Sequence, residues 1–165
     1  MGSVYALILV AHASIVDRIE AVVGQRIVTA SDIAFESEFD PHDQSPVPTL
    51  ERPDYGLRER LVDFAAIRSL AGDIEVFRPS PTEVMDRWER FRATWDPPET
   101  YTAFLRRWGM DDDALRGFLY SRLVVERYVT RNLAVRSARD LDATIDPYPA
   151  WTAELRARTR IRFPR

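Results

Sequence analysis

The sequence of 165 residues contains no cysteine and no lysine, and it has only six glycines and two histidines. Without cysteine the chain has no disulfide, no thiolate zinc site and no thiol nucleophile. Without lysine, a P-loop lysine, a Schiff base and a catalytic Ser–Lys pair are excluded. The few glycines form no phosphate-binding loop, and no GxSxG motif is present. Several large classes of enzyme are therefore excluded.

The remaining candidates for catalysis or metal binding are weak. His42 is the only histidine after residue 14, and in a proline-rich stretch a solvated side chain is its expected state. Asp111-Asp112-Asp113 lacks the spacing of a calcium loop and is interpreted as the start of a helix. No pair of acidic residues lies in a recognisable acid–base motif. We expect no catalytic residue, no metal site and no cofactor.

The overall composition is that of a folded domain. Hydrophobic residues make up 45% of the chain and charged residues 30%, which is typical of a globular protein. The net charge is −3, and all 23 basic residues are arginine. Because the total charge predicts no basic surface, a nucleic acid partner is not expected. The length favours a single domain.

The first thirteen residues have the features of a secretory signal peptide. Residues 4–11 form an apolar run that is too short to span a bilayer. Ala11-His12-Ala13 is a small-x-small cleavage sequence. We predict export with cleavage after Ala13. The residues before the apolar run carry no positive charge, which leaves two alternatives: a start codon further upstream, or a buried N-terminal strand.

The first half of the mature chain predicts a β-hairpin followed by two helices. Residues 15–23 alternate loosely, Gly24-Gln25 supplies a turn and residues 26–29 form the returning strand. Ser31 or Asp32 is expected to cap the first helix, and the four prolines in residues 40–53 predict a loop. A helical spacing then runs from residue 55 through Leu57, Leu61, Phe64, Ile67, Leu70 and Ile74.

Capping motifs mark the helices of the second half. Ser80-Pro-Thr-Glu83 is a capping box, and residues 96–99 repeat the pattern with Asp96 as the cap. We expect Glu83 and Arg87 to form an exposed i,i+4 pair. Apolar spacing predicts a long helix from residues 111–113 to about Leu133, a terminal helix at 150–157 and a strand at 160–163.

One stretch is unusually rich in aromatic residues. The interpretation that needs no binding function is a packed core, and the functional alternative is that some of the rings line an apolar groove for extended peptides. The candidate peptide-binding residues are Trp88, Phe91, Trp95, Tyr101, Phe104 and Trp108.

Several segments, taken in order, resemble the SurA family of chaperones. Val16-Asp-Arg, Ala-Val-Val, a turn and a Ser-Asp helix start are similar to the beginning of mature SurA-family proteins. The later segments resemble the family's second, third, fifth and C-terminal helices and its final strand, at residues 57–63, 74–84, 108–116 with 122–129, and 151–163. Between the long helix and the terminal helix, SurA relatives carry one or two parvulin-type isomerase domains, which this chain lacks.

The resemblance implies a mainly α-helical fold. The implied fold is a multi-helix chaperone core like those of SurA and of the C-terminal part of trigger factor. It includes a small antiparallel sheet made by the N-terminal hairpin and the C-terminal strand. The expected organisation is a signal peptide at 1–13 and one domain at 14–165. That domain divides into an N-terminal part at 14–134, a linker at 135–149 in place of the isomerase, and a C-terminal helix and strand at 150–165. Because this linker is short, we predict that residues 160–163 pair antiparallel with the hairpin.

The resemblance also implies a function. We expect an ATP-independent periplasmic chaperone that holds unfolded or extended polypeptides, such as outer-membrane proteins, without isomerase activity, a cofactor or a membrane span. One alternative is a non-catalytic envelope module that docks a single folded partner. A third and weaker alternative is an enzyme that uses carboxylates alone, which would require a polar pocket holding two acids of raised pKa.

Overall fold

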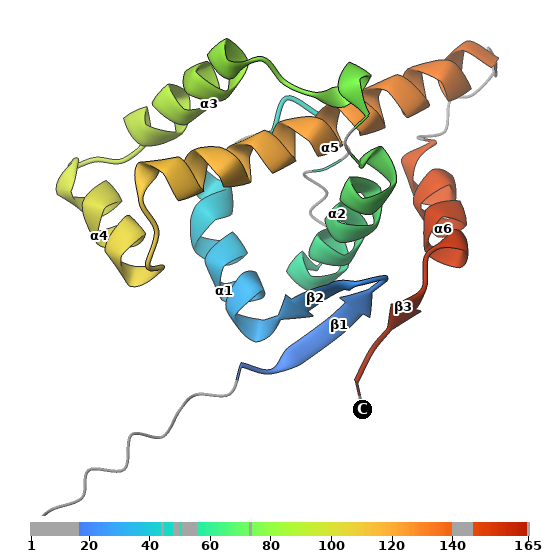
Figure 1. The fold of residues 1–165 in the computed structure, drawn as a ribbon, viewed down its shortest axis with the longest axis horizontal. Helices are drawn as coiled ribbons and strands as arrows, with labels where there is room; N and C mark the ends of the chain where they lie inside the picture. Colours follow the sequence, from blue (N-terminus) through green and yellow to red (C-terminus); the bar gives the residue numbers. More distant parts are fainter. Residues whose placement is uncertain are drawn as a thin grey trace, which may run out of the picture.

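In a computed structural model, helices lie beside a small antiparallel sheet at one edge of the structure (Figure 1). The structure describes residues 17–43, 45–47, 50, 56–72, 74–139 and 147–164, with the side chains of 135–139 excepted. The predicted signal peptide at 1–13 lies outside the described residues, as does the middle of the predicted linker. The division of the chain at these two places stays a prediction.

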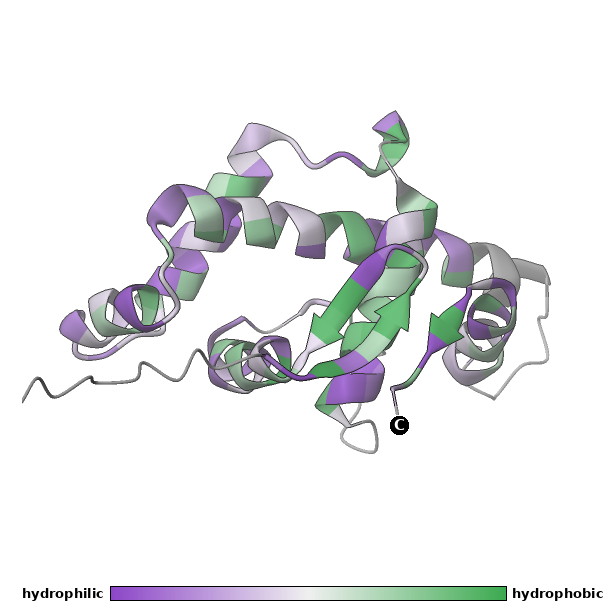
Figure 2. Ribbon diagram, turned by 60° about the horizontal axis from the view of Figure 1, so that its bottom comes forward, coloured by the Kyte–Doolittle hydropathy of each residue, from purple (hydrophilic) through white to green (hydrophobic). Residues whose placement is uncertain are grey.

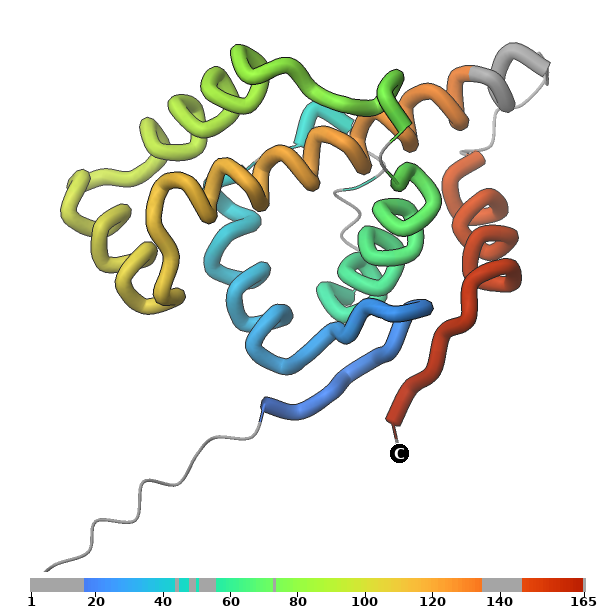
Figure 3. The backbone as a smooth tube through the Cα atoms, in the orientation of Figure 1, coloured from blue at the N-terminus to red at the C-terminus, as the bar shows by residue number. Residues whose placement is uncertain are grey.

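The sheet brings the two ends of the described chain together (Figure 3). β1 (Ile19–Val23) and β2 (Arg26–Thr29) form the hairpin, and β3 (Ile161–Arg162) pairs with the other side of β1, giving the order β2-β1-β3. Both pairings are antiparallel, and Val23 lies opposite Ile161. Gly24 takes a φ of 60° at the first position of the two-residue turn, where glycine is favoured. The predicted contact between the hairpin and the C-terminal strand is confirmed.

The described part of the chain is mainly α-helical, as predicted. The α-helices are α1 (Ala30–Phe39), α2 (Leu57–Ala71), α3 (Pro81–Ala93), α4 (Glu99–Arg107), α5 (Asp112–Arg139) and α6 (Tyr148–Arg158). Short 3-10 helices lie at η1 (Asp40–His42) and η3 (Glu75–Phe77). The capping box at Ser80 is present as expected, with Glu83 as its partner.

Several predicted helix ends were wrong. Thr29 caps α1, because the backbone N–H and hydroxyl of Ser31 both bind the Asp17 carboxylate instead. α2 ends before Gly72, whose φ is 51°, so Ile74 lies outside the helix and is 52% exposed. Asp96 caps nothing: α4 begins at Glu99 without a side-chain cap.

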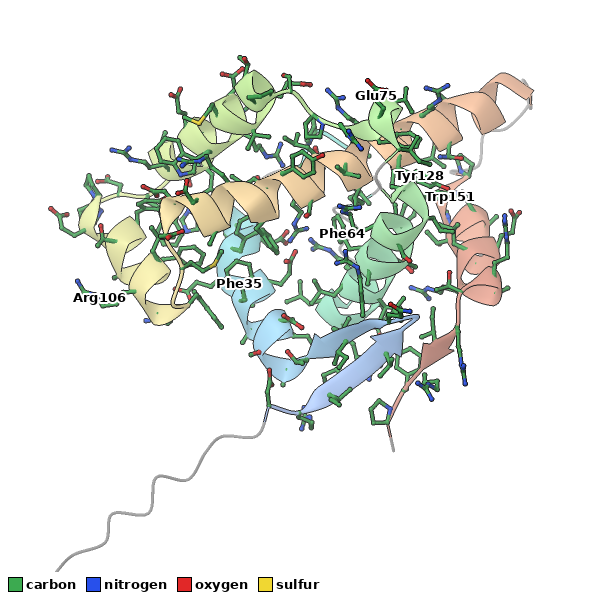
Figure 4. The ribbon with its side chains drawn as sticks, in the orientation of Figure 1. Phe35, Phe64, Glu75, Arg106, Tyr128 and Trp151 are labelled. Atoms are coloured by element: carbon green, nitrogen blue, oxygen red, sulfur yellow. The ribbon has the colours of Figure 1, made fainter. Side chains whose placement is uncertain are left out.

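The long helix α5 organises the hydrophobic core. Its residues contribute to three of the four clusters of buried apolar side chains in the described structure. The first cluster joins α1, α3, α4 and the start of α5, and another joins α2, α5 and α6. In the latter, Tyr128 of α5 lies 6.2 Å from Trp151 of α6 between ring centroids (Figure 4). Figure 2 shows hydrophobic residues along the strands, and Ala21, Val23 and Val28 pack against α2.

Replacing Trp151 with alanine should lower the free energy of unfolding by about 3–5 kcal/mol. The side chain is only 3% exposed, and the change would leave a cavity between α5 and α6. Val76→Ala is the control, since Val76 is 52% exposed and its truncation should cost no more than about 0.5 kcal/mol. The measurement is urea unfolding followed by circular dichroism. A loss below about 1 kcal/mol for Trp151→Ala would contradict the packing of α6.

Glu83→Gln should make the stability at the start of α3 independent of pH. Glu83 accepts hydrogen bonds from the backbone N–H and hydroxyl of Ser80 and pairs with Arg127, and these contacts lower its pKa to about 2. Because the folded-state pKa is lowered, the stabilisation is present above the ordinary value of 4.5 and is lost as pH falls through about 2.

At neutral pH the variant should be less stable by about 1 kcal/mol, a small value because the carboxylate is half exposed and screened. The difference from the unmodified protein should shrink as the pH falls from 4.5 toward 2. Glu89→Gln, at an exposed position of the same helix, is the matched control. A difference that stays constant over this range would sink the idea.

Candidate binding pocket

The six aromatic residues singled out from the sequence lie together, but in the core. Trp88, Phe91, Tyr101 and Phe104 are each 9% exposed or less and pack with Phe39. The indole N–H of Trp88 donates to the Tyr101 hydroxyl at 3.0 Å, so even the polar atoms are satisfied internally. Four of the six are therefore not accessible to a ligand in this conformation.

The other two members of the set, Trp95 and Trp108, are partly buried against the same cluster. The indole of Trp108 donates to Glu38 at 2.9 Å, and the ring of Trp95 stacks on His42 with 3.6 Å between centroids. His42 is thus half-buried, whereas the sequence had suggested a solvated side chain. Burial lowers the pKa of His42. Peptide binding by the six aromatics stays a prediction.

An apolar pocket lies elsewhere, between β2, α1, α2 and α5. Its volume is about 280 Å³. Phe35 of α1 and Phe64 of α2 lie on either side of it (Figure 4), and Phe118 of α5 contributes a third ring. The remaining apolar wall consists of Ile27, Val28, Leu61, Ala65 and Val125. The walls can therefore receive an apolar side chain.

Two buried charged residues also line this pocket. Glu36 of α1 is fully buried and forms an ion pair with Arg122 of α5. The guanidinium of Arg122 lies 4.4 Å from the ring centroid of Phe64, which is within cation–π distance. A second arginine, Arg60, lies 3.6 Å from Glu36 and binds Asp40 through two hydrogen bonds. The carboxylate and the guanidinium thus neutralise each other beneath the apolar walls.

The other polar residues of the pocket are more exposed. They are Arg26, Asp32, Arg68 and Ser121. Arg26 is exposed at the start of β2, while the carboxylate of Asp32 is held by the capping box of α1. The pocket therefore combines an apolar wall with a polar rim, which is the usual composition of a site that binds an organic group rather than a metal ion.

A second buried ion group lies farther along α5. Arg87 of α3 contacts Asp43 at 2.5 Å and Glu126 at 3.1 Å, and Glu126 also accepts a hydrogen bond from Ser45. Burial raises the pKa of Glu126, and the charge of Arg87 partly opposes this. The predicted exposed pair of Glu83 with Arg87 was wrong, because Arg87 turns inward and Glu83 binds Ser80 and Arg127.

The pocket is not visible in the sequence. Its rings come from three helices that lie far apart in the chain, and each ring on its own reads as an ordinary core position. Phe64 belongs to a predicted apolar helical spacing, and Phe35 and Phe118 lie in segments predicted to be helical. Only the packing of α1, α2 and α5 places the three around one space.

Within the described residues, no group of three or more histidines and acids could hold a metal ion, and no helix combines the length and apolar character needed to cross a membrane. No protein-family model, curated protein or solved structure matches this chain.

Arg122→Met alone should lower the free energy of unfolding by about 3–5 kcal/mol, because it leaves Glu36 buried without its main partner. The double variant Glu36→Leu with Arg122→Met should lie within about 1 kcal/mol of the unmodified protein or exceed it, since neither charge is then stranded. In both variants Arg60 keeps its ion pair with Asp40. Urea unfolding of the single and double variants measures the cycle, and additive losses would contradict the pairing.

Proposed function

We propose that this protein is an ATP-independent chaperone that holds unfolded polypeptides and has no prolyl isomerase activity. The observation that carries the proposal is the open pocket between β2, α1, α2 and α5, with its apolar walls and polar rim. Its volume of about 280 Å³ exceeds the roughly 150 Å³ of an apolar cavity that takes up benzene. It therefore has room for a large apolar side chain, of the kind that a folded protein keeps inside.

The chemistry of the walls favours aromatic and branched side chains of the polypeptide. Burying apolar surface contributes roughly 25 cal/mol per Å², and contact with the rings of Phe35, Phe64 and Phe118 adds directional ring packing. Neither contribution requires nucleotide hydrolysis. A single pocket of this size contacts only a short part of a long polypeptide, which suits holding and release.

The sequence supports the proposed location and the proposed class of polypeptides. The signal-peptide pattern at residues 1–13 and the resemblance to the SurA family together support a periplasmic location. They also support outer-membrane or secreted proteins as the unfolded polypeptides that are held. These two points belong to the proposal.

Ile27→Asp should reduce holding activity, while Val76→Asp should not. Both side chains are slightly more than half exposed, so the two substitutions perturb folding similarly, but only Ile27 lines the pocket. The assay dilutes a urea-unfolded outer-membrane β-barrel protein into buffer without ATP and follows light scattering. We expect at least about a tenfold higher concentration of Ile27→Asp to be needed for half suppression, because a charge at the pocket wall is costly to desolvate.

The alternative function, docking of one folded partner, predicts a different result. Ile74, which directly precedes η3, and Val76, which lies within η3, are each 52% exposed, and this is the specific observation for that alternative. In that case neither the unmodified protein nor the Ile27→Asp variant would suppress aggregation. In a pull-down from envelope extract, the Val76→Asp variant would lose a partner that the unmodified protein retains. If Ile27→Asp suppresses aggregation as well as the unmodified protein, the pocket is not the holding site.

A further inference from the structure

The sheet has an unpaired edge beside the pocket. In the order β2-β1-β3, β1 is central and β3 covers its far side, so the outer side of β2 has no neighbouring strand among the described residues. Figure 1 shows β2 on the side of the sheet that borders α1 and α2. An edge strand with free backbone groups is a template for pairing with another extended chain.

The lining of the pocket indicates that this edge, and not one face of the sheet, borders the cavity. Arg26, Ile27 and Val28 all line the pocket. Successive side chains of a strand point to opposite faces of the sheet, so a cavity over one face would contact every second residue. Three residues in a row place the cavity along the side of the strand.

The hydrogen bonds of the hairpin show which backbone groups point outward. In the turn directly after β1, the N–H of Gly24 donates to the carbonyl of Arg160, so Gly24 faces the side of β1 that carries β3. Because backbone groups alternate in direction along an antiparallel strand, Val23 faces β2, its partner Arg26 faces β1, and Ile27 faces away from the hairpin.

The next residues of the strand agree with this alternation. The N–H of Thr29, two residues further on, points the same way as Ile27 and donates to Asp32, while the N–H of Ala30 turns back to Arg18. Within the described part of the chain, neither the N–H nor the carbonyl of Ile27 has a hydrogen-bond partner on the outer side of β2. One donor and one acceptor are therefore available at the pocket.

We propose that a held polypeptide adds to β2 as a fourth strand, with its backbone paired to Ile27 and its side chains entering the pocket at every second position. This rests on the proposed holding function and names its substrate class, which is extended, β-forming segments with alternating apolar residues. Main-chain hydrogen bonds then supply an affinity that does not depend on sequence, and the pocket supplies the preference for apolar side chains.

The short edge limits how tightly such a strand binds. Thr29 already uses its outward N–H in the capping box of α1. The added strand therefore gains mainly the two hydrogen bonds of Ile27, each of which typically contributes about 1 kcal/mol. Modest affinity of this kind allows the polypeptide to be released without ATP.

The test uses a fluorescently labelled peptide in which phenylalanine and threonine alternate, and fluorescence anisotropy measures its binding to the full chain. Two further peptides are N-methylated at every second residue, one on the phenylalanines and one on the threonines. N-methylation in the register that faces β2 should weaken binding about tenfold, while the other register changes it less than about twofold. The two peptides carry the same number of methyl groups, so they control for each other.

Two variants of the protein test the same contact. Ile27→Pro removes the outward N–H, whereas Ile27→Ala shortens the side chain but keeps the N–H. Proline is tolerated at an edge strand where the N–H faces outward, and the proline variant should bind the unmethylated peptide about three- to tenfold more weakly than the alanine variant. If the proline variant does not fold, as judged by circular dichroism, the two methylated peptides decide the question with the unmodified protein.

Equal effects of the two methylated peptides would overturn the strand-addition proposal while leaving the holding function in place. In that case the peptide binds through its side chains alone. A chain that binds neither the peptide nor a urea-unfolded protein would overturn the holding function, and strand addition with it. The aggregation assay and the methylated peptides thus separate the two proposals.

Discussion

The fold depends on how two buried charges on α5 are neutralised. Arg122 and Glu126 lie four residues apart, so they share one side of the helix, and both are nearly fully buried. An unpaired buried charge costs several kcal/mol, so each must meet an opposite charge from another element. Glu36 of α1 pairs with Arg122, and Arg87 of α3 pairs with Glu126. These contacts connect α1 and α3 to α5.

The same ion pair forms part of the pocket wall. Glu36 and Arg122 line the pocket together, and Arg122 also lies over the ring of Phe64. Such a space suits a side chain supplied by another polypeptide, which is how the proposed chaperone would use it.

The sheet joins this pocket to the ends of the chain. β3 covers one side of the hairpin and leaves the outer side of β2 facing the pocket. In the proposed strand addition, this edge would select an extended backbone and the cavity would select apolar side chains. The aromatic residues of α3 and α4 that the sequence suggested as a peptide site pack in a core cluster with α1 and α5, and peptide binding by them stays a prediction.

What the sequence determined by itself is the local structure. The turn at Gly24, the capping box at Ser80 and the terminal strand were all predictable, because turns, caps and apolar spacing depend on neighbours a few residues away. The pairing of the hairpin with the terminal strand was predicted from the resemblance and the short linker, and not from local pattern. The tertiary structure alone decided that Arg87 turns inward and that Phe35, Phe64 and Phe118 surround one pocket. Those outcomes depend on which distant charges and rings meet, and sequence spacing carries no information about such long-range partners.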